Sequence, residues 1–259
     1  MRNFKLILQY EGTRYQGWQR QISTTNTIQG RLEALLTKMV NRKTEIHGSG
    51  RTDAGVHALG QCANFHAVTD MSCAEICAYM NRYLPEDIGV ISVEEVPERF
   101  HSRLNAVGKT YRYRVLNTDI PHVFDRRYVY EFPAALDMEA MTKAAGYLVG
   151  THDFRAFTSA KKGKKSTVRT IEDIHIERVN DEIRFTYSGD GFLFHMIRIV
   201  TGTLLEAGTG ERKPEDIETI MDRGVREDAG KLVPARGLTL MEVRYNDRSF
   251  YEKKGKWKR

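Results

Sequence analysis

One short stretch of the chain has the residue types and spacing of a site that holds a charge ready for chemistry. Residues 48–61 read GSGRTDAGVHALGQ, with a single carboxylate, Asp53, two residues after Arg51. Four glycines surround the pair, and glycine is used where the backbone turns sharply or approaches another group closely. Two interpretations follow: an ordinary surface ion pair, or an aspartate displayed as a nucleophile or charge stabiliser.

Three other stretches carry residues of functional interest. RYQGWQRQ (14–21) mixes arginine, glutamine and aromatic residues, and KTYRYRVLN (109–117) alternates tyrosines with Arg112 and Arg114. Arg198 lies within the apolar run FLFHMIRIV (192–200), where a buried charge needs a partner. The residues alone favour Tyr111 as an ordinary packing residue of a sheet. Arg198 is equally well explained by snorkelling to the surface.

Several other kinds of site are not supported. His66, Cys73 and Cys77 do not have the spacing of structural zinc ligands, and the two cysteines, four apart on one helix face, are expected in the core. GTLLEAGTGER (202–212) lacks the residue order of a phosphate-binding loop. Neither GxSxG nor HExxH occurs in the chain. The sequence therefore predicts no metal site and no standard hydrolase site.

Hydrophobic periodicity predicts alternating strands and helices. Strands are expected at 4–12, 44–48, 60–68, 89–96, 109–117, 166–179, 181–189 and 237–245, with helices at 27–40, 73–84, 138–150, 192–208 and 214–224. Asn26 and Gln29 are expected to form a capping box, and Asn180 and Asp181 a tight turn. The predicted class is mixed α/β (α+β), with much antiparallel pairing and two mixed-sheet domains. Residues 1–105 would carry the Asp53 loop, and residues 106–259 would carry Tyr111 and Arg198.

Composition sets broad limits. The chain has 259 residues, 41% of them hydrophobic, and a formal net charge of +6. Its apolar runs are all shorter than the ~20 residues that span a bilayer, and three closely spaced cysteines do not suggest a disulfide framework. A soluble cytoplasmic protein is expected. AKKGKKSTVR (160–169) and EKKGKWKR (252–259) are interpreted either as basic segments for phosphate backbones or as a solvated loop and a frayed tail.

The motifs together resemble a known family. GRTDAGVHA (50–58) resembles the signature of the tRNA pseudouridine synthase A family. Similar family motifs follow in the same order: RYQGWQRQ (14–21), IQGRLE (28–33), FHSRLNAVGKTYRY (100–113), STVRTI (166–171), FLFHMIRIVTGTLLEAG (192–208) and ARGLTL (235–240). The resemblance extends from about residue 3 to residue 245. It departs at Gly48 and Ser49, where alanine or threonine is frequent, and in the lysine-rich 161–165 segment.

The resemblance implies a role for each candidate residue. Asp53 would be the catalytic aspartate, and Tyr111 the ring that stacks on the target base. Arg198 would pair with Asp53, and Arg51 would help to hold the target nucleotide out of the stem. The family resemblance also implies two α/β domains around a central basic cleft, a homodimer, and no cofactor or metal. Its substrates would be uridines at positions 38, 39 and 40 of the tRNA anticodon stem-loop.

Two other classes of function compete with this interpretation. An RNA-binding module without catalysis would use the basic segments and aromatics, but an acid in a phosphate-binding groove opposes binding, so Asp53 would be unexplained. A metal-dependent nuclease or phosphotransferase would need two or more clustered acids to hold Mg²⁺. The stretch around Asp53 contains one acid.

Overall fold

The computed structural model describes residues 1–160 and 166–246. Its strands are β1 (Arg2–Tyr10), β2 (Ile46–Gly48), β3 (His57–Ala67), β4 (Ile88–Val96), β5 (Ala106–Leu116), β6 (Tyr130–Glu131), β7 (Gly150–Asp153), β8 (Val168–Val179), β9 (Glu182–Gly189) and β10 (Leu238–Tyr245). Its helices are α1 (Ile28–Val40), α2 (Cys73–Tyr83), α3 (Met138–Gly146), α4 (Met196–Gly208) and α5 (Asp216–Arg223). Short 3₁₀ turns are η1 (Arg155–Phe157), η2 (Arg226–Asp228) and η3 (Ala235–Gly237). The lysine-rich 161–165 segment and the 252–259 tail, interpreted above as basic segments, lie outside the described residues.

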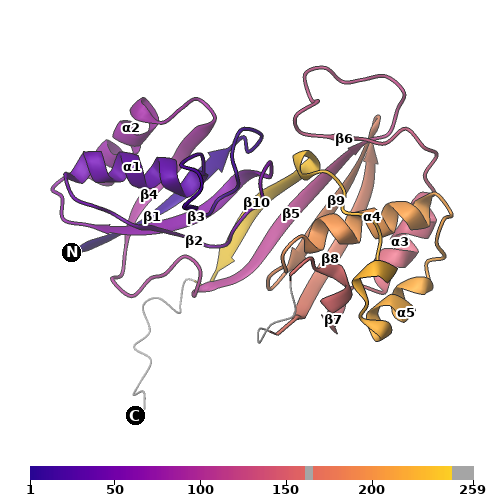
Figure 1. Ribbon diagram of the computed structural model, residues 1–259. Coiled ribbons are helices and arrows are strands. Elements are labelled where there is room, and N and C mark those ends of the chain that lie inside the picture. The colour runs from indigo at the N-terminus through magenta and orange to yellow at the C-terminus, as the bar shows by residue number, and fades with distance from the viewer. Residues whose placement is uncertain (161–165, 247–259) are drawn as a thin grey trace, which may run out of the picture.

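One mixed sheet runs through both halves of the chain (Figure 1). Its strand order is β4-β1-β3-β10-β5-β9-β8-β7, with β2 paired to β3 and β6 paired to β5. In Figure 1, α1 and α2 lie over the N-terminal half, and α3, α4 and α5 lie over the C-terminal half. The predicted mixed α/β class with much antiparallel pairing is therefore confirmed. The boundary between domains 1–105 and 106–259 stays a prediction.

The last strand joins the two halves. Strand β10 pairs in parallel with β3, where Thr239 lies opposite His57, and antiparallel with β5, where Leu240 lies opposite Tyr111. The two halves of the sheet are therefore hydrogen-bonded to each other through β10, a strand of eight residues (Leu238–Tyr245) near the C-terminal end of the described chain.

A row of buried side chains crosses the sheet on one face and forms part of the core. Tyr10, Ala58, Leu240, Tyr111 and Tyr187 are paired from strand to strand and are all buried. On this face the Tyr187 hydroxyl lies 2.8 Å from the Thr201 hydroxyl of α4. Because side chains alternate along a strand, the arginines that follow Tyr111 and Tyr113 on β5 point to the opposite face.

Most element boundaries agree with the sequence prediction, and the differences have local causes. Helix α4 begins at Met196 rather than at residue 192, because His195 has a φ of 65° and interrupts the helical backbone. The helix expected to end at Gly150 ends at Gly146, and Gly150 (φ +114°) opens β7. The turn at Asn180 is confirmed, with a φ of 55°.

The predicted capping box at the start of α1 is wrong. Thr27 is the N-cap, and its side chain accepts a hydrogen bond of 3.1 Å from the Gly30 N–H. Gln29 instead accepts from the Arg20 N–H and donates to Glu33. Threonine is also a favoured N-cap residue, although a weaker one than asparagine, so the helix still gains a side-chain cap one residue later.

Across residues 1–160 and 166–246, none of the helices has the length and apolar character needed to cross a membrane.

Candidate active site

The loop that carries Asp53 is held by backbone contacts with the 13–18 segment. The Trp18 N–H donates to the Thr52 carbonyl over 3.0 Å, and the Gly55 N–H donates to the Tyr15 carbonyl over 3.3 Å. Gly17 has a φ of +84°, and a Cβ there would lie 2.7 Å from the Thr52 oxygen. Only glycine accepts that backbone and that approach. The two segments therefore lie directly on each other, which fixes the position of Asp53.

The aromatic residues of RYQGWQRQ belong to the core. Tyr15 and Trp18 are both buried, and the Trp18 ring lies so close to Gly48 that a side chain there would collide with it. The motif therefore supports the Asp53 loop from beneath, and its aromatics are not exposed to stack on a nucleic-acid base.

Arg198 lies against Asp53. Its Nη1 is 3.3 Å from the Asp53 Oδ2, and its Nε donates a 2.8 Å hydrogen bond to the Val233 carbonyl. The exposed side-chain fractions are 11% for Arg198 and 18% for Asp53. The guanidinium is therefore held on two sides within a largely buried site, and the snorkelling interpretation does not describe it.

Tyr111 lies near the same carboxylate. It is buried on β5, and its ring meets Phe192 edge-on, with centroids 5.5 Å apart. Burial raises the pKa of the Tyr111 hydroxyl well above its usual value, and the neighbouring Tyr10 and Asp53 side chains raise it further. The hydroxyl is therefore neutral at physiological pH.

Arg51 differs from the other three candidates. It is exposed on the rim of the loop, and across residues 1–160 and 166–246 the structure shows no hydrogen bond or ion pair to it. The structure thus brings Asp53, Arg198 and Tyr111 together and leaves Arg51 directed to solvent.

His195 was missed by the sequence analysis, although its Nε2 lies 3.6 Å from the Asp53 Oδ2. Burial lowers the pKa of this histidine, while the Asp53 charge partly opposes the effect. The imidazole is therefore mainly neutral. The only signal in the sequence was its place three residues before Arg198, and because His195 lies outside α4 that spacing does not by itself place the two side chains together.

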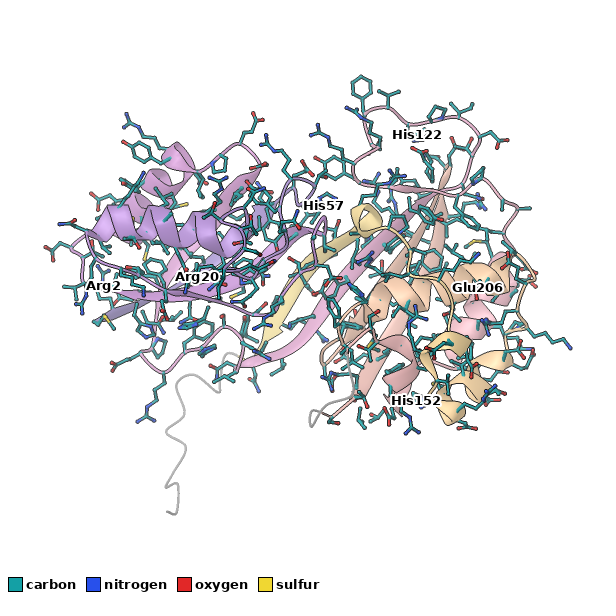
Figure 2. The ribbon with its side chains drawn as sticks, viewed as in Figure 1. Arg2, Arg20, His57, His122, His152 and Glu206 are labelled. Atoms are coloured by element: carbon teal, nitrogen blue, oxygen red, sulfur yellow. The ribbon has the colours of Figure 1, made fainter. Side chains whose placement is uncertain are left out.

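His57, in the same motif as Asp53, links three loops. Its Nδ1 accepts from the Gly12 N–H at 3.0 Å, and its Nε2 donates toward the carbonyls of Arg127 and Arg236, 2.9 and 3.1 Å away. These partners fit the neutral tautomer with its proton on Nε2. Burial lowers the pKa of His57, which favours the same form. In Figure 2, His57 lies where the two halves of the sheet meet.

Lys109 supports the other end of the Asp53 loop. Its Nζ donates to the Ser49 carbonyl over 3.0 Å and would lie 2.5 Å from a Cβ on Gly50, so glycine gives it room. Burial, together with the charges of Arg103 and Arg169, lowers the pKa of Lys109 to about 8.

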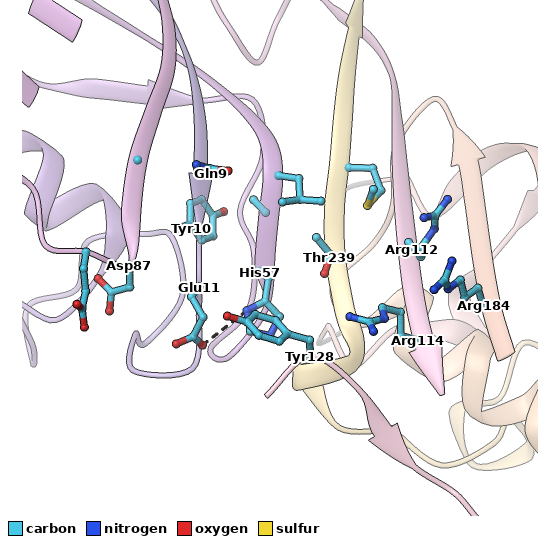
Figure 3. Close-up of a pocket in the computed structure, with 15 residues that line it drawn as sticks. Gln9, Tyr10, Glu11, His57, Asp87, Arg112, Arg114, Tyr128, Arg184 and Thr239 are labelled. Carbon is cyan, nitrogen blue, oxygen red and sulfur yellow. Dashed lines mark ion pairs between the residues drawn. The ribbon is translucent and has the colours of Figure 1, made fainter. Parts of the chain in front are cut away.

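The arginine-rich face of the sheet forms a separate cavity of about 560 Å³ (Figure 3). Its lining includes His57, Arg112, Arg114 and Arg184 but not Asp53. Glu182 forms ion pairs with both Arg114 and Arg184. Much of the positive charge on this face is therefore neutralised within the sheet, and the cavity is distinct from the Asp53 site.

Metal ligands are not gathered anywhere in the described part of the chain: no group of three or more histidine, cysteine, aspartate or glutamate side chains there has an arrangement that could hold a metal ion.

Comparison with known proteins agrees with this geometry. The sequence model of the tRNA pseudouridine synthase family matches residues 6–105 and 144–246. The chain is 48% identical to tRNA pseudouridine synthase A of Bacillus sp. (strain KSM-64), covering 95% of this chain and all of the relative. It is 45% identical to tRNA pseudouridine synthase A 2 of Clostridium tetani, covering 95% of this chain and 99% of the relative. The chain therefore belongs to the tRNA pseudouridine synthase family.

Proposed function

We propose that this protein isomerises uridine to pseudouridine in tRNA, with Asp53 as its catalytic residue. The observation that carries the proposal is the Asp53–Arg198 ion pair, which has a length of 3.3 Å and lies in a largely buried site. The loop that carries Asp53 is held in place by close packing against Gly17. Following the family resemblance, the substrates are uridines at positions 38, 39 and 40 of the anticodon stem-loop, and the enzyme acts in the cytoplasm.

The reaction needs one well-placed carboxylate. The N1–C1′ bond of uridine breaks, the uracil rotates, and a C5–C1′ bond forms. C5 then loses its proton and N1 gains one, so the product is an isomer. Asp53 would attack C1′, attack the uracil ring, or stabilise positive charge on the ribose as uracil departs. Each route uses the negative charge that the Arg198 guanidinium stabilises.

Two other residues complete the proposed site. The detached uracil must be retained, and the Tyr111 ring, buried beside Asp53, would lie beneath it. A base within a stem must first be flipped out, at a cost of a few kcal/mol that positive groups filling the gap offset. Arg51 is suited to that task because it is exposed on the rim of the catalytic loop.

The chemistry is proposed to need no cofactor and no metal ion, since bond breakage and re-formation occur within one nucleotide. Activity that persists in excess EDTA would support this part of the proposal. A metal-dependent nuclease would instead lose activity and, without EDTA, would shorten the RNA.

We also propose that the protein is a homodimer. The β5–β6 loop exposes three apolar side chains, Ile120, Val123 and Phe124, and such residues close together in one exposed loop favour a protein–protein contact. Light scattering after gel filtration should give twice the chain mass. Serine at Val123 and Phe124 should lower that mass if this loop forms the contact.

Asp53→Asn tests the central assignment. The amide keeps size and hydrogen-bonding ability but removes the charge, so tritium release from [5-³H]uridine-labelled tRNA should fall to background. Binding of tRNA should be unchanged or slightly tighter, because an acid facing phosphates repels them. The thermal midpoint should fall only modestly, because the Arg198 guanidinium loses its charged partner but can still donate to the amide oxygen and to the Val233 carbonyl.

Asp70→Asn is the matched control, because Asp70 is an exposed aspartate outside the site, and it should release tritium like the wild type. Asp53→Asn with a near-wild-type rate would refute the catalytic role. If the protein were an RNA-binding module without catalysis, neither the wild type nor either variant would form pseudouridine.

A further inference from the structure

We infer that Phe194 and His195 form a stacking platform for the RNA base adjacent to the uridine that is isomerised. This inference rests on the proposed function, and it assigns a second base-binding position beside the one formed by Asp53 and Tyr111.

The two side chains already have the geometry of stacked bases. Their ring centroids are 3.7 Å apart and their planes are inclined by 27°. Successive bases of a nucleic-acid strand are spaced by about 3.4 Å. His195 is the inner ring, and Phe194 is the outer one, with 52% of its surface exposed. A base placed on Phe194 would therefore continue an existing stack.

The pair lies at the correct place for a neighbouring nucleotide. The His195 Nε2 is 3.6 Å from the Asp53 Oδ2, so the inner ring borders the position of the reacting uridine. Phe194 is the next ring outward. Burial lowers the pKa of His195, the Asp53 charge raises it, and the charges of Arg198 and Arg226 lower it, so two cationic side chains lie near the platform beside the Asp53 carboxylate. Exposed aromatic rings beside cationic groups are typical of sites for unpaired RNA bases.

Hydrogen bonds hold the backbone that carries the outer ring. The Phe194 carbonyl accepts a 2.9 Å hydrogen bond from the Thr158 hydroxyl and a 3.3 Å hydrogen bond from the Ser159 N–H. The next residue, His195, is one of three non-glycine residues with positive φ in the described chain. With the backbone held and the ring already stacked on His195, a base that stacks on Phe194 orders little of the protein that is not ordered already.

Folding alone does not explain this arrangement. The left-handed backbone at His195 is unfavourable, and its Nδ1 is buried with no hydrogen-bond partner among the described residues. A large aromatic ring is also kept in water at Phe194. Strain of this kind collects at functional sites, where the surrounding structure maintains it.

Exposure alone does not make a platform, and the chain offers a matched control. Tyr83 is 55% exposed and packs on Tyr79 of the same helix, α2, with centroids 4.7 Å apart. This second aromatic pair has similar exposure but has no contact with Asp53, Arg198 or Tyr111 in the described structure. Tyr83→Leu therefore reports the effect of losing an exposed aromatic ring elsewhere.

The test combines protein variants with altered RNA. Wild type, Phe194→Leu, Phe194→Trp and Tyr83→Leu are assayed for tritium release from an anticodon stem-loop RNA. A second set of RNAs carries an abasic nucleotide on either the 5′ or the 3′ side of the target uridine. One base–aromatic stack should contribute roughly 10- to 100-fold to kcat/KM, mostly through KM.

For wild type, one of the two abasic RNAs should show that loss. Phe194→Leu should show the same loss of kcat/KM with intact RNA. Its kcat/KM should fall little further with that abasic RNA, since the two changes remove the same contact. Phe194→Trp should retain activity, and Tyr83→Leu should match wild type with every RNA. Equal thermal midpoints for wild type and Phe194→Leu would show that the fold is intact.

Three results would overturn the platform. In the first, the losses of kcat/KM caused by Phe194→Leu and by the abasic nucleotide multiply when the two are combined. In the second, both abasic RNAs react with wild type as fast as intact RNA does. In the third, Phe194→Leu leaves kcat/KM unchanged, as a protein-docking role for Phe194 would give. The proposed function fails separately, if wild type makes no pseudouridine in intact RNA.

Discussion

Replacing Lys109 by methionine should stabilise the folded protein at neutral pH, even though it removes a hydrogen bond to the Asp53 loop. The ammonium is protonated in water with a pKa near 10.5, and in the folded chain burial and the neighbouring Arg103 and Arg169 lower that pKa to about 8. Each pH unit of difference corresponds to about 1.4 kcal/mol, so the buried charge destabilises the fold by about 3 kcal/mol below pH 8. The lost hydrogen bond to Ser49 is worth about 1 kcal/mol, which leaves a net gain of about 2 kcal/mol.

The pH dependence gives this prediction a sign and a window. Below about pH 8, both folded and unfolded chains carry the Lys109 proton, and the penalty is fully present. Between about 8 and 10.5, the unfolded chain holds the proton and the folded chain releases it, so the free energy of unfolding contributed by this residue rises with pH. The advantage of Lys109→Met should therefore shrink across that window and become a loss of about 1 kcal/mol above it, where only the missing hydrogen bond remains.

Urea denaturation of both proteins from pH 7 to pH 10 measures this effect, and the difference between them removes the contributions of other groups. Binding of tRNA should weaken in the variant, because a phosphate would stabilise the ammonium that folding penalises. A difference in unfolding free energy that is zero at pH 7, or that does not change with pH, would refute the reasoning.

Two further predictions concern the support of Asp53. Arg198→Met should lower kcat by about 100-fold or more while leaving most of the tRNA affinity. Arg198→Lys should recover little activity, because an ammonium lacks the planar guanidinium that contacts both Asp53 and the Val233 carbonyl. A wild-type kcat for Arg198→Met in single-turnover assays would contradict this prediction. Gly17→Ala should lower the thermal midpoint and kcat together, because Gly17 has a φ of +84° and the new Cβ would collide with the Thr52 carbonyl oxygen. Gly210→Ala is the control, since Gly210 has a similar φ of +78° but open space around it. This variant should lose only the ~1 kcal/mol of backbone strain and keep the wild-type kcat.

Local patterns predicted most of the secondary structure but not the details that depend on tertiary contacts. The alternation of aromatic and charged residues predicted β5 and its two faces, because apolar rings such as Tyr111 favour the buried face and arginines such as Arg112 do not. The start of α4 was placed four residues early, since FLFH is as apolar as the helix that follows. Nothing in those letters reveals that His195 takes a left-handed backbone. The two-residue strand β6 is too short to leave a pattern.

The sequence predicted those site residues whose type was unusual for their surroundings in the chain. A charge at Arg198 in an apolar run required a partner, and Asp53 among glycines suggested a role beyond packing. The structure adds the 3.3 Å contact between them. His195 and Lys109 escaped notice because their importance lies in what surrounds them after folding: Asp53 for one, the Ser49 carbonyl for the other.

The position of β10 in the sheet also has a consequence for biosynthesis. Strand β5 ends at Leu116 and its neighbour β10 begins at Leu238, so a growing chain holds both edges of the gap long before the strand that fills it exists. At about 5–20 residues per second, the ribosome needs roughly 6–24 s to cover that interval. The row from Tyr10 to Tyr187 is completed only by Leu240, so a nascent or prematurely terminated chain lacks the strand that unites the two halves. Such products would leave the edges of β3 and β5 that face the gap unpaired, which makes them substrates for chaperones and proteases.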